Sequence, residues 1–177
     1  MNPSRKDISR AWLPALIWLA IIAVESTSFF SADNTGRWMY PFFHSVFGLD
    51  LVRFGVWHHY LRKTGHFVGY FTLSILLFRA WRATLPASTD FEFEVPGNWS
   101  FRWARISVLM TILVACADEW HQSYIPSRTG SIRDVWLDGT AGLVAQIVVF
   151  VWLKMRGRKA EHSTALGLSH PAAPGDD

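Results

Sequence analysis

The sequence contains only one cysteine, Cys116, which lies inside an apolar run. A single cysteine excludes an intrachain disulfide and gives no information on the redox compartment. The sequence also lacks an HExxH motif and the Cys/His spacing of a zinc site, and the oxygen ligands of hard metals are too common to be diagnostic. We therefore predict no metal and no cofactor.

Basic residues do not form the stripe, interleaved with aromatic stacking platforms, that is typical of nucleic-acid binding. The net charge of +3 and the pI near 9.3 come from Lys and Arg residues that flank apolar runs. The chain is 50% hydrophobic, contains 10 Trp and 13 Phe, and has a positive mean hydropathy. This composition is unusual for a soluble fold and indicates an integral membrane protein with no nucleic-acid partner.

Four apolar stretches are long enough to cross a hydrocarbon core of about 30 Å as helices that rise about 1.5 Å per residue. They are residues 11–30, 61–81, 103–124 and 134–153. We interpret the first as an anchor, because it is long for a signal peptide, lacks a small-x-small cleavage site and precedes three further stretches. We thus predict an all-α integral membrane bundle of four transmembrane helices (11–153), between a cytoplasmic N-terminus (1–10) and a basic, then disordered, cytoplasmic tail (154–177).

The distribution of Lys and Arg predicts the orientation of this bundle. Eleven of the 17 fall on the side of the N-terminus and six on the other side. The positive-inside rule therefore favours a multi-pass protein of the inner (cytoplasmic) membrane with both termini in the cytoplasm. The outer loop 31–60 is rich in aromatic residues, so we expect it to lie along the headgroup region or to form a re-entrant turn. In the inner loop 84–100, the alternating FEFEV either pairs as a small strand or rests at the interface.

Ionisable side chains gather near the predicted outer ends of all four spans. In the first span this side chain is Glu25. An ionisable group costs about 2.5–3.5 kcal/mol at the centre of a membrane, so each one requires an explanation. Residues three or four positions apart share one face of a helix. Three such stripes can face one another in a bundle: Lys63, His66 and Tyr70; Asp118 and Gln122; and Asp134, Asp138 and Gly142.

Structural explanations compete with a functional one for these residues. Arg62, Glu119 and His121 could simply contact headgroups and water, as interfacial tryptophans do. Asp134 fits a helix N-cap, and Asp138 fits a first-turn acid favoured by the helix dipole. The cluster as a whole exceeds what capping requires. Two interpretations stay open: a functional site, or a buried ion-pair network that fixes helix packing.

Three segments resemble a known family. KTGHFVGY, followed by DEWHQSYIPSRTGSIRDVWLDGTAG, is similar to the motifs of VanZ-like membrane proteins, and ESTSFFSADNT resembles the first outer boundary of that family. Many relatives have Asn at the position of Asp138. The resemblance implies either a link to low-level teicoplanin resistance, through the founding member, or a housekeeping role in the cell envelope. The matching residues are Lys63, His66, Tyr70, Asp118, Glu119, Gln122, Arg128, Asp134, Asp138 and Gly142.

One functional hypothesis is an enzyme or lipid-binding protein that acts on an anionic envelope lipid or cell-wall precursor at the outer leaflet. Arg128, Arg133 and Lys63 would clamp phosphate or carboxylate oxygens, because Arg offers a planar donor fork and Lys a point charge. Positioned His and carboxylate side chains would act as general acid and base. The candidate catalytic residues are His66, Asp118 and Glu119, and the other candidate substrate-binding residues are Tyr70, Gln122, Asp134, Asp138 and Glu25.

The other hypothesis is a noncatalytic membrane scaffold or accessory subunit whose polar cluster fixes helix packing. It is favoured by the lack of a recognised nucleophile arrangement, because Ser127 and Ser131 have no His-Asp order around them. A transporter fits less well, since four spans are few for a pathway unless the chain forms a homo-oligomer, with which the sequence is compatible.

Overall fold

The computed structural model describes residues 5–86, 99–126 and 130–168. Within these ranges the chain forms five α-helices and one 3-10 turn and no strand, so the all-α prediction is confirmed for the described residues. The predicted FEFEV segment lies outside them. The elements in chain order are α1 (Arg5–Glu25), η1 (Ser28–Phe30), α2 (Ala32–Phe47), α3 (Leu51–Thr84), α4 (Phe101–Gln122) and α5 (Ile132–Leu168).

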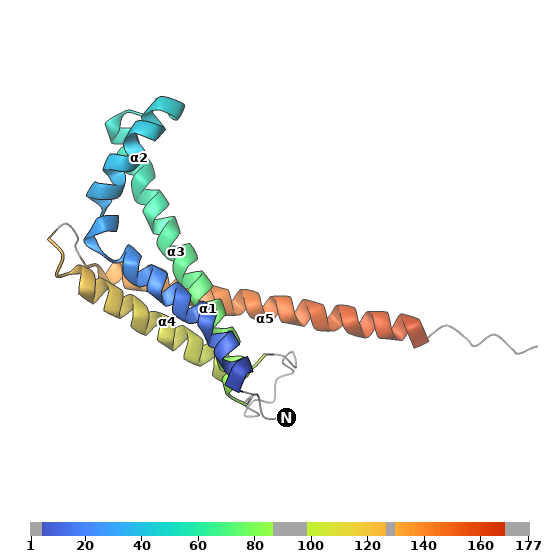
Figure 1. The fold of residues 1–177 in the computed structure, drawn as a ribbon. Helices are drawn as coiled ribbons and strands as arrows, with labels where there is room; N and C mark the ends of the chain where they lie inside the picture. The colour runs from blue at the N-terminus through green and yellow to red at the C-terminus, as the bar shows by residue number, and fades with distance from the viewer. Residues whose placement is uncertain (1–4, 87–98, 127–129, 169–177) are drawn as a thin grey trace, which may run out of the picture.

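Helix α3 is the centre of the bundle, because it packs against α1, α4 and α5. In Figure 1, α1 and α4 run in one direction, whereas the lower part of α3 and the first half of α5 run in the other. Alanines at three contact points let the helix backbones approach closely. The buried core consists of Ala15, Ile22, Tyr70, Leu73, Leu77, Ala115 and Ala141.

Two of the described helices are long and apolar enough to cross a membrane, over Lys6–Glu25 in α1 and Ile132–Lys159 in α5. α3 and α4, with 34 and 22 residues, are long enough but less apolar, because they carry many of the charged and polar side chains near the predicted outer ends. Large hydrophobic side chains such as Leu13, Leu113 and Ile147 are exposed, which is compatible with a surface that faces lipid. Four spans remain a prediction.

The aromatic segment 31–60, predicted as an interfacial loop or a re-entrant turn, is a helical hairpin. Ser31 caps α2, Asp50 caps α3 by accepting a hydrogen bond of 2.8 Å from the Arg53 N–H, and Gly48 joins the two helices with φ of 63°. Only glycine adopts such a positive φ without strain. The hairpin projects away from the bundle (Figure 1). Exposed aromatic side chains, including Trp38 and Trp57, cover its outside.

Two hydrogen bonds and one ring stack hold the hairpin together and attach it to the bundle. Thr35 Oγ1 and His58 Nε2 are joined by a hydrogen bond of 3.0 Å, and the His58 ring stacks on Phe54 at 5.4 Å. Arg62 Nη1 donates a hydrogen bond of 2.8 Å to the Phe30 carbonyl oxygen, which ties the turn η1 to α3. These bonds give the hairpin a defined packing although most of its apolar side chains face outward.

Helix α5 continues to Leu168, well beyond the bundle (Figure 1). Residues 157–168, which belong to the part of the tail predicted to be disordered, are helical, and residues 169–177 lie outside the described ranges. Two pairs of side chains stabilise the helix where the tail begins. Lys154 Nζ lies 5.9 Å from the Phe150 ring, and the Arg156 guanidinium lies 4.6 Å from the Trp152 ring. Both pairs have the four-residue spacing that stabilises a helix.

We expect the hairpin to loosen in acid. Burial, reinforced by the positive charge of Arg62, lowers the pKa of His58, which precedes the predicted span 61–81. The folded hairpin therefore binds protons less readily than the opened one, so its stability is full above the ordinary histidine pKa of about 6.5 and falls as the pH drops below it. Hydrogen exchange of residues 32–60, corrected for intrinsic rates, should speed up between pH 7.5 and pH 5.

Two histidine variants provide the control for this prediction. His58→Gln should remove the pH dependence of exchange, because glutamine does not titrate. His59→Gln changes an adjacent, exposed histidine and should leave the dependence intact. Equal pH dependence in both variants would show that His58 does not control the hairpin.

Candidate functional site

Three cross-helix contacts form the centre of the polar cluster. On α3, the Lys63 Nζ donates to Asp134 Oδ1 of α5, and the Tyr70 hydroxyl donates a 2.9 Å hydrogen bond to Asp118 Oδ2 of α4. Between them on the same stripe, His66 Nδ1 lies 3.5 Å from an oxygen of Asp138 on α5. The α3 stripe thus faces the acidic residues of both neighbouring helices.

The start of α5 is held against the end of α4 by a carboxylate. Glu119 Oε2 accepts a hydrogen bond of 2.6 Å from the Ser131 N–H. This approach requires glycine at position 130, because a Cβ there would lie 2.5 Å from the Glu119 carbonyl oxygen. Glu119 is buried. Its Oε2 atom holds Ser131 at the start of α5, and its Oε1 atom has no hydrogen-bond partner among the described residues.

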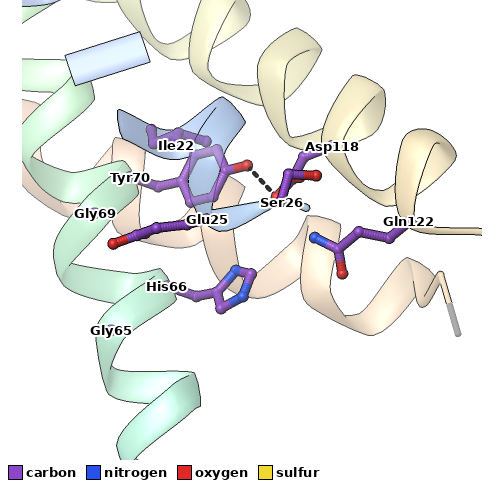
Figure 2. Close-up of a pocket in the computed structure, with 9 residues that line it drawn as sticks. All are labelled: Ile22, Glu25, Ser26, Gly65, His66, Gly69, Tyr70, Asp118 and Gln122. Atoms are coloured by element: carbon purple, nitrogen blue, oxygen red, sulfur yellow. Dashed lines mark hydrogen bonds between the residues drawn. The ribbon is translucent and has the colours of Figure 1, made fainter. Parts of the chain in front are cut away.

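A small cavity opens beside the Tyr70–Asp118 hydrogen bond, between α3, α4 and the end of α1. Its volume is about 30 Å³, enough for a water molecule and too small for a lipid headgroup. Figure 2 shows the His66 ring and Gln122 on one side of it, with the Glu25 side chain directed away from Asp118. The lining residues are Ile22, Glu25, Ser26, Gly65, His66, Gly69, Tyr70, Asp118 and Gln122.

Several buried polar atoms of the cluster have no hydrogen-bond partner among the described residues. Buried polar groups nearly always form a hydrogen bond, so each such atom is able to bind a water molecule or a polar group of a ligand. Four of the six atoms belong to carboxylates, and the Asp138 side chain is fully buried. The cluster therefore suits a group that donates hydrogen bonds. The atoms are Asp118 Oδ1, Glu119 Oε1, Gln122 Nε2, His66 Nδ1 and both carboxylate oxygens of Asp138. Of these, His66 Nδ1 and Asp138 Oδ2 lie 3.5 Å apart, within the distance of an ion pair but without a hydrogen bond.

The predicted phosphate clamp is less closely assembled than the carboxylates. Lys63 is already paired with Asp134, and Arg133 is exposed at the beginning of α5. Arg128 lies outside the described residues. Glu25 reaches the cavity from the end of α1. No group of three or more His, Cys, Asp or Glu side chains in the described parts of the chain is arranged to hold a metal ion.

Sequence reasoning missed an extension of the cluster into the bundle. The Ser74 hydroxyl donates a 3.0 Å hydrogen bond to the Gly142 carbonyl oxygen, and Gln146 Nε2 donates to the Ser74 hydroxyl at 2.8 Å and to its carbonyl oxygen at 3.0 Å. The signal was present in the spacing, because Ser74 follows Tyr70 by four residues and Gln146 follows Gly142 by four. At the opposite end of the cluster, Ser26 Oγ and His121 Nδ1 are joined by a hydrogen bond of 3.0 Å.

The contact at Gly130 yields a stability prediction. Gly130→Ala should push the start of α5 away from α4 and break the Ser131–Glu119 hydrogen bond, at a cost of about 1–3 kcal/mol. The thermal unfolding midpoint in detergent should fall. Gly55→Ala is the matched control, because a Cβ there meets nothing within 4 Å and alanine favours the helix. Equal midpoints for wild type and Gly130→Ala would contradict the close approach.

Comparison with known proteins assigns the family. A family model described as VanZ/LLP1 matches residues 11–154, which include all of the cluster. Searches among curated proteins and solved structures gave no significant match. Because the match extends over most of the sequence, it confirms the relationship that the two motifs predicted: the chain belongs to the VanZ/LLP1 family.

Proposed function

We propose that the protein is a multi-pass protein of the cytoplasmic membrane in which α1, α3, α4 and α5 each cross the bilayer and both termini are cytoplasmic. The alternating directions of these helices support the proposal (Figure 1). So does the gathering of their polar side chains at one end of the bundle, since intramembrane ionisable groups face the protein interior and pair with one another. The excess of Lys and Arg on the N-terminal side supports the orientation.

We further propose that the polar cluster binds an anionic lipid or a lipid-linked cell-wall precursor at the outer leaflet. The supporting observation is a cavity whose lining residues carry three buried polar atoms without a hydrogen-bond partner among the described residues: Asp118 Oδ1, Gln122 Nε2 and His66 Nδ1. A hydroxyl or amine of the headgroup would donate to Asp118 Oδ1, while Arg133 would meet the phosphate. The cavity admits one such group at a time, so the rest of the headgroup stays outside.

If a bond is broken, His66, Asp118 and Glu119 are the acid–base candidates. Asp118 is oriented by Tyr70 through Oδ2, which leaves Oδ1 to accept a proton from a hydroxyl or water in the cavity. The resemblance to VanZ-like proteins adds a link to teicoplanin resistance, and the target of that antibiotic lies outside the cytoplasmic membrane. An altered envelope lipid or precursor would connect the site to this phenotype.

A noncatalytic scaffold is the second candidate, and one observation favours it. The contacts of Lys63, His66 and Tyr70 each join α3 to another helix, so the same residues stabilise the bundle. The two candidates differ in what they require of Asp118. A ligand site requires the carboxylate, whereas a scaffold requires only an acceptor for the Tyr70 hydroxyl.

Two matched substitutions separate these candidates. Asp118→Asn retains an oxygen that accepts from Tyr70 but removes the charge, so we expect normal membrane abundance and about tenfold weaker binding of the lipid species held at this site, with an altered teicoplanin response. Tyr70→Phe removes only the helix-joining hydroxyl and should lower the unfolding midpoint. Quantitative lipid mass spectrometry and thermal unfolding provide the two measurements. Unchanged lipid and phenotype in Asp118→Asn, with destabilised Tyr70→Phe, would establish the scaffold instead.

The proposed topology has a direct chemical test. In a Cys116→Ala background, a cysteine introduced at Ser131 should react with a membrane-impermeant maleimide in intact spheroplasts, because Ser131 begins the segment into α5 at the outer end. A cysteine introduced at Lys159 should react only after permeabilisation. Protection of position 131 together with labelling of position 159 would invert the orientation.

A further inference from the structure

An apolar groove of about 470 Å³ lies between α4 and α5, toward the opposite end of both helices from the Tyr70–Asp118 cavity. It is bounded by the first turns of α4 and the middle of α5, whereas the cluster uses the last turn of α4 and the first turns of α5. The volume falls in the range of about 300–1,000 Å³ that is usual for ligand sites. In the proposed topology the groove opens toward the cytoplasmic leaflet. Its walls are formed by Trp99, Phe101, Ala104, Val108, Leu143 and Ile147, among others.

Polar groups occur at defined positions in this apolar surface. The exposed Arg105 lies on the groove wall, and exposed Arg102 precedes it by three residues on the same helix. Trp99 Nε1 is a buried donor, and Gln146 Oε1 a buried acceptor, without a hydrogen-bond partner within the described ranges. Gln146 is 4% exposed and lines the groove. A long apolar occupant with a polar end would match this arrangement.

The charges on the parts of α4 and α5 that form the groove are of one sign. Residues 99–112 and 143–159 contain six Lys and Arg and no Asp or Glu. Arg102 and Arg105 form no ion pair with any described residue. A second copy of the chain would bring its own cations to this end, so like charges disfavour a symmetric docking of two grooves. Basic pockets between helices on the cytoplasmic side instead attract anionic headgroups.

From these observations we infer that the groove binds an anionic phospholipid of the cytoplasmic leaflet. One acyl chain lies along Leu143, Ile147 and Phe150, and the phosphate meets the guanidinium of Arg105, with Arg102 adding charge. Trp99 Nε1 is placed to donate to an oxygen of the ester region. This site is separate from the proposed outer-leaflet site and does not depend on it.

Native mass spectrometry of the full chain in neutral detergent tests the site. Dioleoyl phosphatidylglycerol should bind more tightly than dioleoyl phosphatidylcholine, and Arg105→Gln should weaken the former by about tenfold while leaving the latter unchanged. Arg82→Gln is the matched control, because Arg82 is an exposed cation of α3 that does not line the groove. Inorganic phosphate should not displace the lipid, because it lacks the acyl chain.

A second variant tests the apolar part of the groove. Leu143→Trp fills it with a larger side chain at an exposed position and should weaken both lipids, while circular dichroism reports an intact fold. Arg105→Gln should leave the teicoplanin response unchanged, because Arg105 does not line the outer cavity, so the two proposed sites can fail separately. Equal affinity for the two lipids would contradict a specific site and show that the groove only contacts bulk lipid. An equal loss of phosphatidylglycerol affinity in Arg105→Gln and Arg82→Gln would show the same. A change from dimer to monomer in Leu143→Trp would identify a second copy as the occupant.

Discussion

The arrangement of the bundle depends on a ladder of polar contacts between α3 and α5. The residues at positions 63, 66 and 74 of α3 face those at 134, 138 and 142–146 of α5, in a nearly regular helical repeat. In lipid an apolar interface gives little preference for one register, because lipid tails are as apolar as leucine. A slip by one helical turn would separate the Lys63–Asp134 pair and the Ser74–Gly142 bond together. The ladder therefore fixes the register of the two helices, and with it the positions of α1 and α4 around α3.

The ladder in turn requires close approach of the backbones, which small residues provide. The Ser74 hydroxyl donates to the Gly142 carbonyl oxygen on α5. At the same residue, a Cβ would lie 2.9 Å from Thr111 Cγ2 of α4, and one at Gly139 would lie 3.2 Å from Ile112 Cγ1. Glycine thus lets α5 approach α4 closely at the depth where it is bonded to α3. The glycines and the polar ladder consequently depend on each other. Larger residues in place of the glycines would separate the helices, and separated helices would leave the polar groups of the ladder without partners.

Sequence analysis could predict the parts of this structure that depend on local spacing. The predicted third span, 103–124, agrees within two residues with α4, because an apolar run of that length has few alternatives. The stripe of Lys63, His66 and Tyr70 followed from the helical repeat. The hairpin of α2 and α3 did not, since its aromatic residues suit an interfacial loop equally well and its turn depends on one glycine, Gly48. Ser74 and Gln146 were overlooked because an uncharged polar side chain in an apolar run gives a weak signal until its partner is known.

The two ends of the bundle present opposite chemistry, and Gln146 lies where they meet. Carboxylates dominate the buried cluster, whereas the described residues that line the groove include a cation, Arg105, and no acid. The Gln146 amide nitrogen closes the ladder at Ser74, while its oxygen has no described partner and the residue lines the groove. A rotation of this side chain that satisfied its oxygen from the groove would therefore break both bonds to Ser74. Because Ser74 also holds Gly142, such a change would loosen the register on which the distant Lys63–Asp134 and His66–Asp138 contacts depend.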